Sequence, residues 1–71
     1  MNERTWNINY WIKEKLKAQL QCKKEHLHHT AEIYELELNG MLQYMRSVGD
    51  ISEETYYKVH KISTLIRKKY R

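Results

Sequence analysis

Residues 48–54 constrain the fold most, because they are the one place where the sequence clearly ends one helix and begins another. Gly49 follows apolar residues at helical spacing, and a glycine there can take the left-handed conformation that completes a helix C-terminus. Ser52 is a good N-cap, since its hydroxyl can accept a hydrogen bond from a backbone N–H of the next helix. Ile51 and Tyr56 have the spacing of a hydrophobic staple. The sequence therefore predicts a tight turn between two helices.

The rest of the chain has the composition of long helices. Proline is absent and glycine occurs only at Gly40 and Gly49, so few residues can interrupt a helix. We predict an all-α fold in which residues 1–71 form one small domain. A chain this short buries only about 60% of the surface that it exposes when unfolded, so a monomer would be marginally stable and association with a partner is plausible.

The lone cysteine, Cys22, excludes an internal disulfide and suits a reducing compartment, so we expect a cytoplasmic protein. No apolar run is long enough for a signal peptide or a transmembrane helix, and we expect no membrane partner. The net charge of +4 permits an acidic partner without requiring one.

Apolar residues at spacings of three or four follow one helix side from Ile12 to Val48. Between these two lie Leu16, Leu20, Leu27, Ala31, Tyr34, Leu38, Met41 and Met45. We predict a continuous helix over residues 5–48 and a second over residues 52–70, forming an antiparallel helical hairpin. The first helix would be roughly 65 Å long at 1.5 Å per residue, longer than the second can cover. Its exposed length predicts a homodimer, in the manner of a coiled coil.

The alternative breaks the first helix at residues 28–30, with Thr30 as a new N-cap, and gives a monomeric three-helix bundle. The stripe of apolar residues is thin in this region, which supports the break. The chain has no Gly, Pro, Asn or Asp between Tyr10 and Leu38 to form a loop at low cost, which favours the continuous helix.

Gly40 lies inside the predicted first helix. A glycine there costs about 1 kcal/mol of helix propensity relative to alanine. Such a glycine indicates either the close approach of another helix or a mild kink.

The most aromatic part of the chain lies near its N-terminus and contains Trp6, Tyr10 and Trp11. Helical spacing does not place these three residues on a single face. They either pack in the core or anchor a partner, since aromatic residues in a small patch are frequent binding hot spots. We expect Trp6, Tyr10 and Trp11 to form the partner-binding site.

Few residues suggest catalysis or a cofactor. The chain has no nucleophile motif, no phosphate-binding glycine loop and no carboxylate cluster, so we expect neither an enzyme nor a small-molecule substrate. Cys22, His26 and His29 would share one face of a continuous helix, and thiolate and imidazole are ligands that zinc accepts. A fourth ligand is not evident, so a solvated polar face is the better interpretation and no cofactor is expected.

Basic residues gather toward the C-terminus and support an alternative function, nucleic-acid binding. They are Lys61, Arg67, Lys68, Lys69 and Arg71. Such side chains could neutralise phosphates. The same helix begins with Glu53 and Glu54, which would repel phosphate at the position where a helix-turn-helix protein reads bases.

The segment over residues 33–70, with its glycine-containing turn and Leu65-Ile66 near its end, resembles the helical hairpins of small bacterial regulators. These include the aspartyl-phosphate phosphatases of sporulating bacteria. In that family a Ser-Gln-Glu-Leu-Asp motif carries the activity. At the equivalent place this chain reads Val-His-Lys-Ile-Ser over residues 59–63, which lacks the acidic residue. The resemblance therefore implies shared architecture and not the phosphatase activity.

These observations together predict a small helical protein that acts by binding another protein. We expect it to regulate or inhibit a larger bacterial or phage protein, and to self-associate through its first helix. Nucleic-acid binding through the C-terminal basic residues is the alternative.

Overall fold

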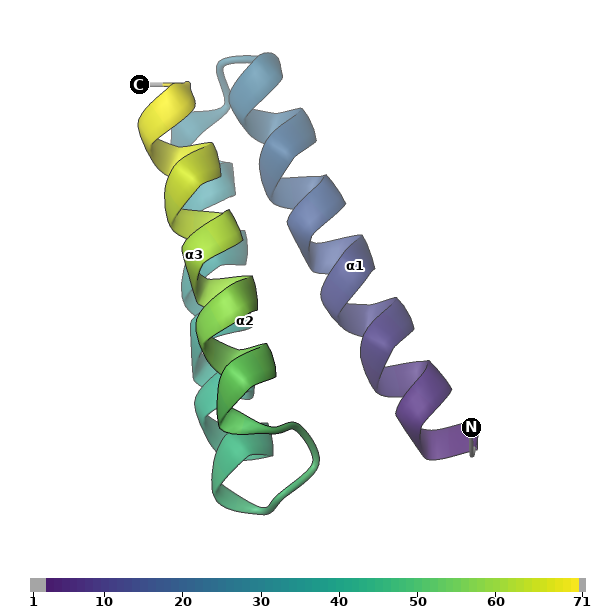
Figure 1. The fold of residues 1–71 in the computed structure, drawn as a ribbon. Helices are drawn as coiled ribbons and strands as arrows, with labels where there is room; N and C mark the ends of the chain where they lie inside the picture. Colours follow the sequence, from purple (N-terminus) through teal and green to yellow (C-terminus); the bar gives the residue numbers. More distant parts are fainter. Residues whose placement is uncertain (1–2, 71) are drawn as a thin grey trace.

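The computed structural model describes the backbone of residues 3–70 and the side chains of residues 7–70. It contains three helices that run up, down and up: α1 (Glu3–Lys24), α2 (His28–Ser47) and α3 (Glu53–Lys69) (Figure 1). All regular structure in the described residues is helical, as the composition predicts. The bundle measures 36 × 20 × 15 Å along its principal axes.

The predicted continuous first helix is wrong, because the chain turns between Lys24 and His28. His26 adopts a left-handed backbone with a φ of 61°. The backbone N–H of His26 donates to the carbonyl of Lys23 (3.1 Å), and that of Leu27 donates to the carbonyl of Cys22 (2.8 Å). This pair of bonds is a Schellman motif, which satisfies the last carbonyls of a helix. Residues 28–30, where the alternative placed the break, instead form the first turn of α2.

This turn also removes the argument for a dimer that was based on a long exposed helix. With the chain folded back on itself, α1 covers α2, and α1 contacts α2 more extensively than it contacts α3. The predicted N-cap at Thr30 is wrong as well, because Leu27 occupies the N-cap position of α2 and makes no side-chain capping bond.

The predicted turn between α2 and α3 is confirmed. Gly49 has a φ of +81°, and its N–H donates to the carbonyl of Arg46 (3.2 Å). Ser52 is the N-cap of α3, and its Oγ accepts a bond from the backbone N–H of Thr55 at 3.1 Å. Ile51 and Tyr56, the predicted staple pair, both pack against the hydrophobic core.

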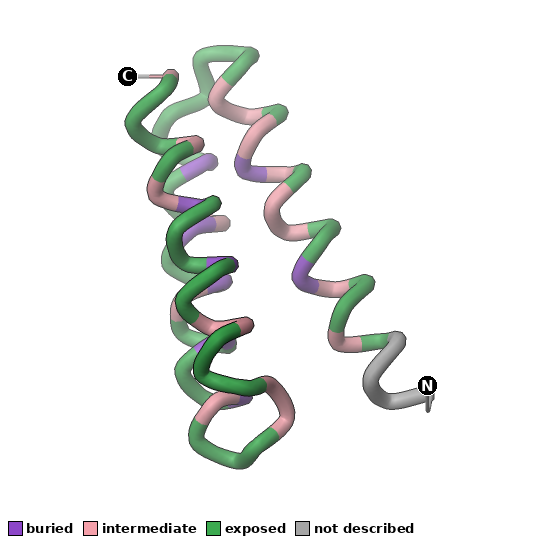
Figure 2. Tube along the Cα trace, viewed as in Figure 1, coloured by how far each residue is buried: buried purple, intermediate pink, exposed green. Residues whose placement is uncertain are grey.

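The core lies on the sides of the helices that face one another, as Figure 2 shows. Its central cluster consists of Ile12, Leu38, Leu42 and Val59. The buried side of α2 follows Ala31, Glu35, Leu38, Leu42 and Met45. Because a glutamate interrupts this stripe, the apolar pattern pointed to the neighbouring side, and the fully buried Leu42 was missed while the 40% exposed Met41 was assigned to the stripe.

Candidate partner-binding groove

A groove of about 440 Å³ lies between the N-terminal half of α1 and the C-terminal half of α2. Its lining residues are Asn7, Ile8, Trp11, Met41, Tyr44, Met45 and Asp50. We call it the α1–α2 groove. Figure 1 shows that α1 diverges from the other two helices toward its N-terminal end. The groove residues Asn7, Ile8 and Trp11 belong to this end of α1. Five of the lining side chains are apolar or aromatic, so the groove offers mainly an apolar surface.

Helical periodicity explains how these side chains come together. Ile8 and Trp11 are three residues apart on α1, and Met41 and Met45 are four residues apart on α2, so each pair projects from one side of its helix. Ile8 and Trp11 are partly buried and also pack against the core cluster. Tyr44 is 60% exposed and forms the outer wall. The groove therefore has a floor fixed by the core and a wall open to solvent.

A lysine beside the groove connects its two helices. The Nζ of Lys15 lies 5.5 Å from the centre of the Trp11 ring and 5.4 Å from that of Tyr34. It also forms an ion pair with Glu37. A cation over an aromatic face is attracted by the ring quadrupole. Lys15 thus holds Trp11 at a defined position relative to α2.

The predicted aromatic site is only partly brought into this groove. Trp11 lines it, whereas Tyr10 is 54% exposed and is not among its lining residues. The side chain of Trp6 lies outside the described residues. The prediction missed the contribution of α2, although the apolar arc that includes Met41 and Met45 was visible in the sequence.

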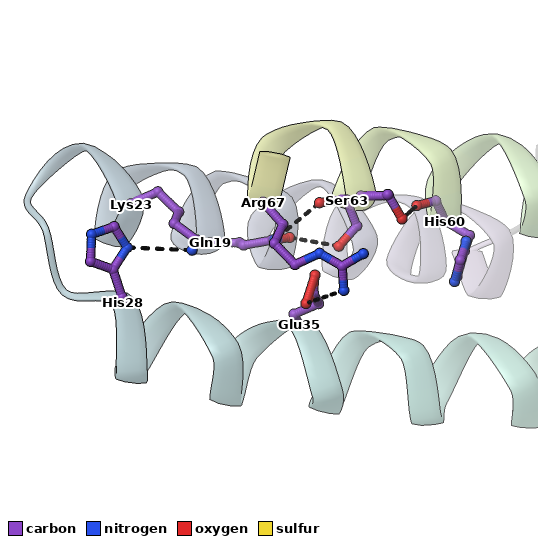
Figure 3. A network of polar contacts seen from close by, with 8 residues as sticks. Gln19, Lys23, His28, Glu35, His60, Ser63 and Arg67 are labelled. Carbon is purple, nitrogen blue, oxygen red and sulfur yellow. Dashed lines mark hydrogen bonds and ion pairs between the residues drawn. The ribbon is translucent and has the colours of Figure 1, made fainter. Parts of the chain in front are cut away.

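A second group of polar side chains lies inside the bundle, toward its other end (Figure 3). The amide Nε2 of Gln19 donates to the backbone carbonyl of Ser63 (3.1 Å), and the hydroxyl of Ser63 donates to Oε1 of Gln19 (2.7 Å). Both residues are 1% exposed. Nearby, the guanidinium of Arg67 lies 3.6 Å from the carboxylate of Glu35.

This polar group joins helices and does not resemble a catalytic site. A nucleophilic serine needs a base at its hydroxyl. The Ser63 hydroxyl donates instead to an amide oxygen, which is not a base. Because both polar side chains are buried, their reciprocal bonds remove the cost of leaving either one unsatisfied.

The basic residues of α3 do not share one face. Lys61 and Lys68 are exposed and seven residues apart, so they lie on one side of α3. Arg67 faces Glu35, and the Nζ of Lys69 lies 5.5 Å from the centre of the Tyr70 ring. Arg71 lies outside the described residues. The side chains of the predicted basic cluster therefore project from different sides of α3.

The three candidate metal ligands, Cys22, His26 and His29, lie on different elements of the fold. Cys22 is half-buried on α1, His26 is in the turn, and His29 is exposed at the start of α2. Among the described side chains, those of residues 7–70, no three from His, Cys, Asp and Glu form a group able to hold a metal ion. The shared face that was expected depended on a continuous helix, which the turn interrupts.

Comparison with models of protein families, with curated proteins and with solved structures gives no match for this chain. None of the three described helices is both long enough and apolar enough to cross a membrane.

Proposed function

We propose that this chain is a cytoplasmic protein-binding module that regulates a larger protein by recognition and not by catalysis. The observation that carries the proposal is the α1–α2 groove, where apolar side chains from two helices surround a volume of about 440 Å³. Two other exposed apolar side chains, Ile62 and Leu65, line a second groove of about 430 Å³ between α1 and α3.

The chemistry of the groove favours an apolar anchor from another protein. Trp11 supplies a large aromatic surface of the kind enriched at binding hot spots. Met41 and Met45 have flexible, polarisable side chains that adapt to the shape of a partner. Only two of its lining residues, Asn7 and Asp50, are polar, as is usual for sites that bind apolar groups. An amphipathic helix with bulky apolar side chains on one face fits this arrangement.

Site-specific photo-crosslinking tests the proposal. A photoreactive amino acid at position 41 should capture one discrete partner in cells, because Met41 lines the groove. The control is position 33, since Ile33 is 50% exposed on the same helix and is not among the residues that line the grooves. The crosslinked species is identified by mass, which separates a second copy of the chain from a different protein.

The affinities of two variants for the partner decide whether the groove is the binding site. The purified partner should bind the unmodified protein and lose at least about tenfold in affinity for Met41→Glu, which places a charge in the apolar groove. Ile33→Glu should bind normally. Equal capture from both positions, or equal affinity of the two variants, would exclude the groove.

Nucleic-acid binding is a second candidate that one feature of α3 supports. Tyr57, Lys61 and Lys68 follow one exposed side of this helix, and Tyr57 is 60% exposed, so bases could stack beside phosphate contacts. Anisotropy of a labelled single-stranded oligonucleotide should then fall steeply with salt and decrease in the double variant Lys61→Ala, Lys68→Ala. Binding that is insensitive to salt or to these changes would exclude this candidate.

A further inference from the structure

The second groove, of about 430 Å³, lies between the C-terminal parts of α1 and α3. We call it the α1–α3 groove. These two helices run in the same direction, so their C-terminal ends lie at the same end of the bundle (Figure 1). Four of the lining residues are aliphatic: Leu20 from α1, and Ile62, Leu65 and Ile66 from α3. Ile62 and Leu65 are 40% and 55% exposed, so the bundle leaves part of this apolar surface open to solvent.

The α1–α3 groove continues into a hollow of about 380 Å³ at the end of the bundle, which we call the basic hollow. Lys24, Lys69 and Tyr70 line both, and Lys23 and His26 complete the lining of the hollow. Among the described residues, no aspartate or glutamate lines either one. The apolar surface therefore ends at a group of lysines.

The two lysines shared by the groove and the hollow keep their charge available. Lys24 and Lys69 form no ion pair with the described carboxylates. The parts of α1 and α3 beside the groove, residues 15–24 and 55–70, contain no aspartate or glutamate. An anion that neutralises these lysines must therefore come from outside the walls of the groove.

The helix dipole explains only part of this arrangement. Lys24 and Lys69 each lie in the last turn of a helix, where the partial negative charge of the C-terminus favours a cation. That effect does not require exposed aliphatic side chains beside the lysines. Apolar surface that is rimmed by polar residues is typical of interaction sites. The combination of the two features therefore points to a ligand that is both apolar and acidic.

We propose that the α1–α3 groove and the basic hollow bind an acidic amphipathic helix of another protein. Its apolar side chains fill the groove, and its carboxylates lie at Lys24 and Lys69. Charge complementarity selects an acidic partner. The aliphatic lining selects a protein over a nucleic acid, which offers phosphates to the lysines but no aliphatic groups to the groove. A recess between two helices accepts side chains that project from a third helix, which is a common mode of peptide recognition.

The length of the groove sets the spacing of residues in the partner. Ile62 and Lys69 are seven residues apart on α3, roughly 10 Å along the helix. Glutamates in the first turn of the partner, followed by leucines about one and two turns later on the same side, match this distance. First-turn glutamates are also stabilised by the dipole of the partner helix. The partner consequently runs antiparallel to α1 and α3.

A labelled synthetic peptide with this pattern is the probe. Fluorescence anisotropy should show that the glutamate peptide binds at least about tenfold more tightly than a peptide with glutamines at the same positions. Raising the salt concentration should weaken binding only in part, because salt screens the charges but not the apolar contact. Single-stranded nucleic acid would lose affinity much more steeply.

Reversal of charge in the protein tests the lysines. The double variant Lys24→Glu, Lys69→Glu should lose at least about tenfold in affinity for the glutamate peptide and should prefer a peptide with lysines in place of the glutamates. The control is Lys61→Glu, Lys68→Glu, which makes the same change in net charge at exposed residues that line neither the groove nor the hollow. Circular dichroism checks that both variants remain helical.

A milder pair of variants tests the apolar contact. Leu65→Gln should weaken binding of the glutamate peptide several-fold, because it places a polar group in the aliphatic part of the groove. Leu36→Gln is the matched control, since Leu36 is 63% exposed on α2 and is not among the residues that line the groove. Equal losses in the two variants would show that the peptide does not occupy the groove.

The other outcomes are equally decisive. No binding of the glutamate peptide up to about millimolar concentration, or equal affinity for the glutamate and glutamine peptides, would overturn the proposal. So would tighter binding of a single-stranded oligonucleotide, or of vesicles of anionic phospholipid, at Lys24 and Lys69. Met41→Glu should leave peptide binding unchanged, because the two grooves share no lining residue. Failure of the α1–α2 groove as a partner site and failure of this site therefore give different results.

Discussion

The two turns of the bundle have the same backbone design but different side chains. At the end of α1, the left-handed residue is His26, with a φ of 61°, and at the end of α2 it is Gly49, with a φ of +81°. In each turn, the next N–H donates back to a carbonyl at the same distance, from Leu27 to Cys22 and from Asp50 to Met45, both at 2.8 Å. Both helices thus end in a Schellman motif.

The difference lies in what holds each turn in place. The second turn has glycine at its left-handed position and a serine cap on the helix that follows, so local sequence encodes it. The first turn has a histidine there and an uncapped leucine before α2. Histidine is one of the few residues enriched at positive φ, so the conformation is permitted but not favoured. Packing of α1 on α2 stabilises this turn, and local signals alone do not.

The largest effect on stability is expected when a side chain is added at Gly49 in the second turn. Gly49→Ala should lower the free energy of unfolding by roughly 1–2 kcal/mol, because alanine is strained at this positive φ. Urea unfolding at low protein concentration measures it. Gly40→Ala is the matched control, since the space around both glycines is open and only the backbone conformation differs. A loss of stability of the same size in both variants would contradict the role assigned to φ.

Removal of the cap should have the next largest effect. Ser52→Ala removes the acceptor for the N–H of Thr55, which should cost about 1 kcal/mol. For a domain of this size that corresponds to a fall in Tm of roughly 4–8 °C. Ser47→Ala serves as the control, because the Ser47 hydroxyl bonds to a carbonyl near the end of α2 and caps no N-terminus. An unchanged Tm for Ser52→Ala would show that packing, and not the cap, fixes the start of α3.

The smallest effect should have the opposite sign. His26→Gly relieves the cost of a side chain at positive φ and should raise the free energy of unfolding by a few tenths to about 1 kcal/mol. His29→Gly is the control, since it places glycine inside the first turn of α2 and should destabilise it. Differential scanning calorimetry distinguishes the two. A destabilised His26→Gly would mean that the imidazole makes a contact that outweighs the backbone strain.

These two turns show how much of the fold the sequence could predict. The end of α2 and the start of α3 could be predicted because Gly49 and Ser52 have strong local preferences. The end of α1 could not, because a histidine at positive φ leaves no distinctive pattern. The buried side of α2 was hard to predict for a related reason, since Glu35 interrupts its apolar periodicity and pairs with Arg67, which comes from another helix.

The candidate groove could be predicted only in part. Trp11 was selected because aromatic residues cluster near the N-terminus. Met41 and Met45 belong to the predicted apolar stripe, but their position opposite Trp11 depends on α1 folding back along α2. A pairing between helices that is created by an unpredicted turn cannot be obtained from periodicity within one helix.

The reciprocal bonds between Gln19 and Ser63 also bear on the order of folding events. These residues are 44 positions apart in the sequence, whereas α1 with α2 and α2 with α3 form through short turns. Contacts between distant residues have a high loop-closure cost, so the two hairpins are expected to precede the docking of α1 on α3. The pair then forms late, and its loss would mainly accelerate unfolding and leave the folding rate nearly unchanged. The bonds between Gln19 and Ser63 would therefore mainly slow the unfolding of the folded bundle.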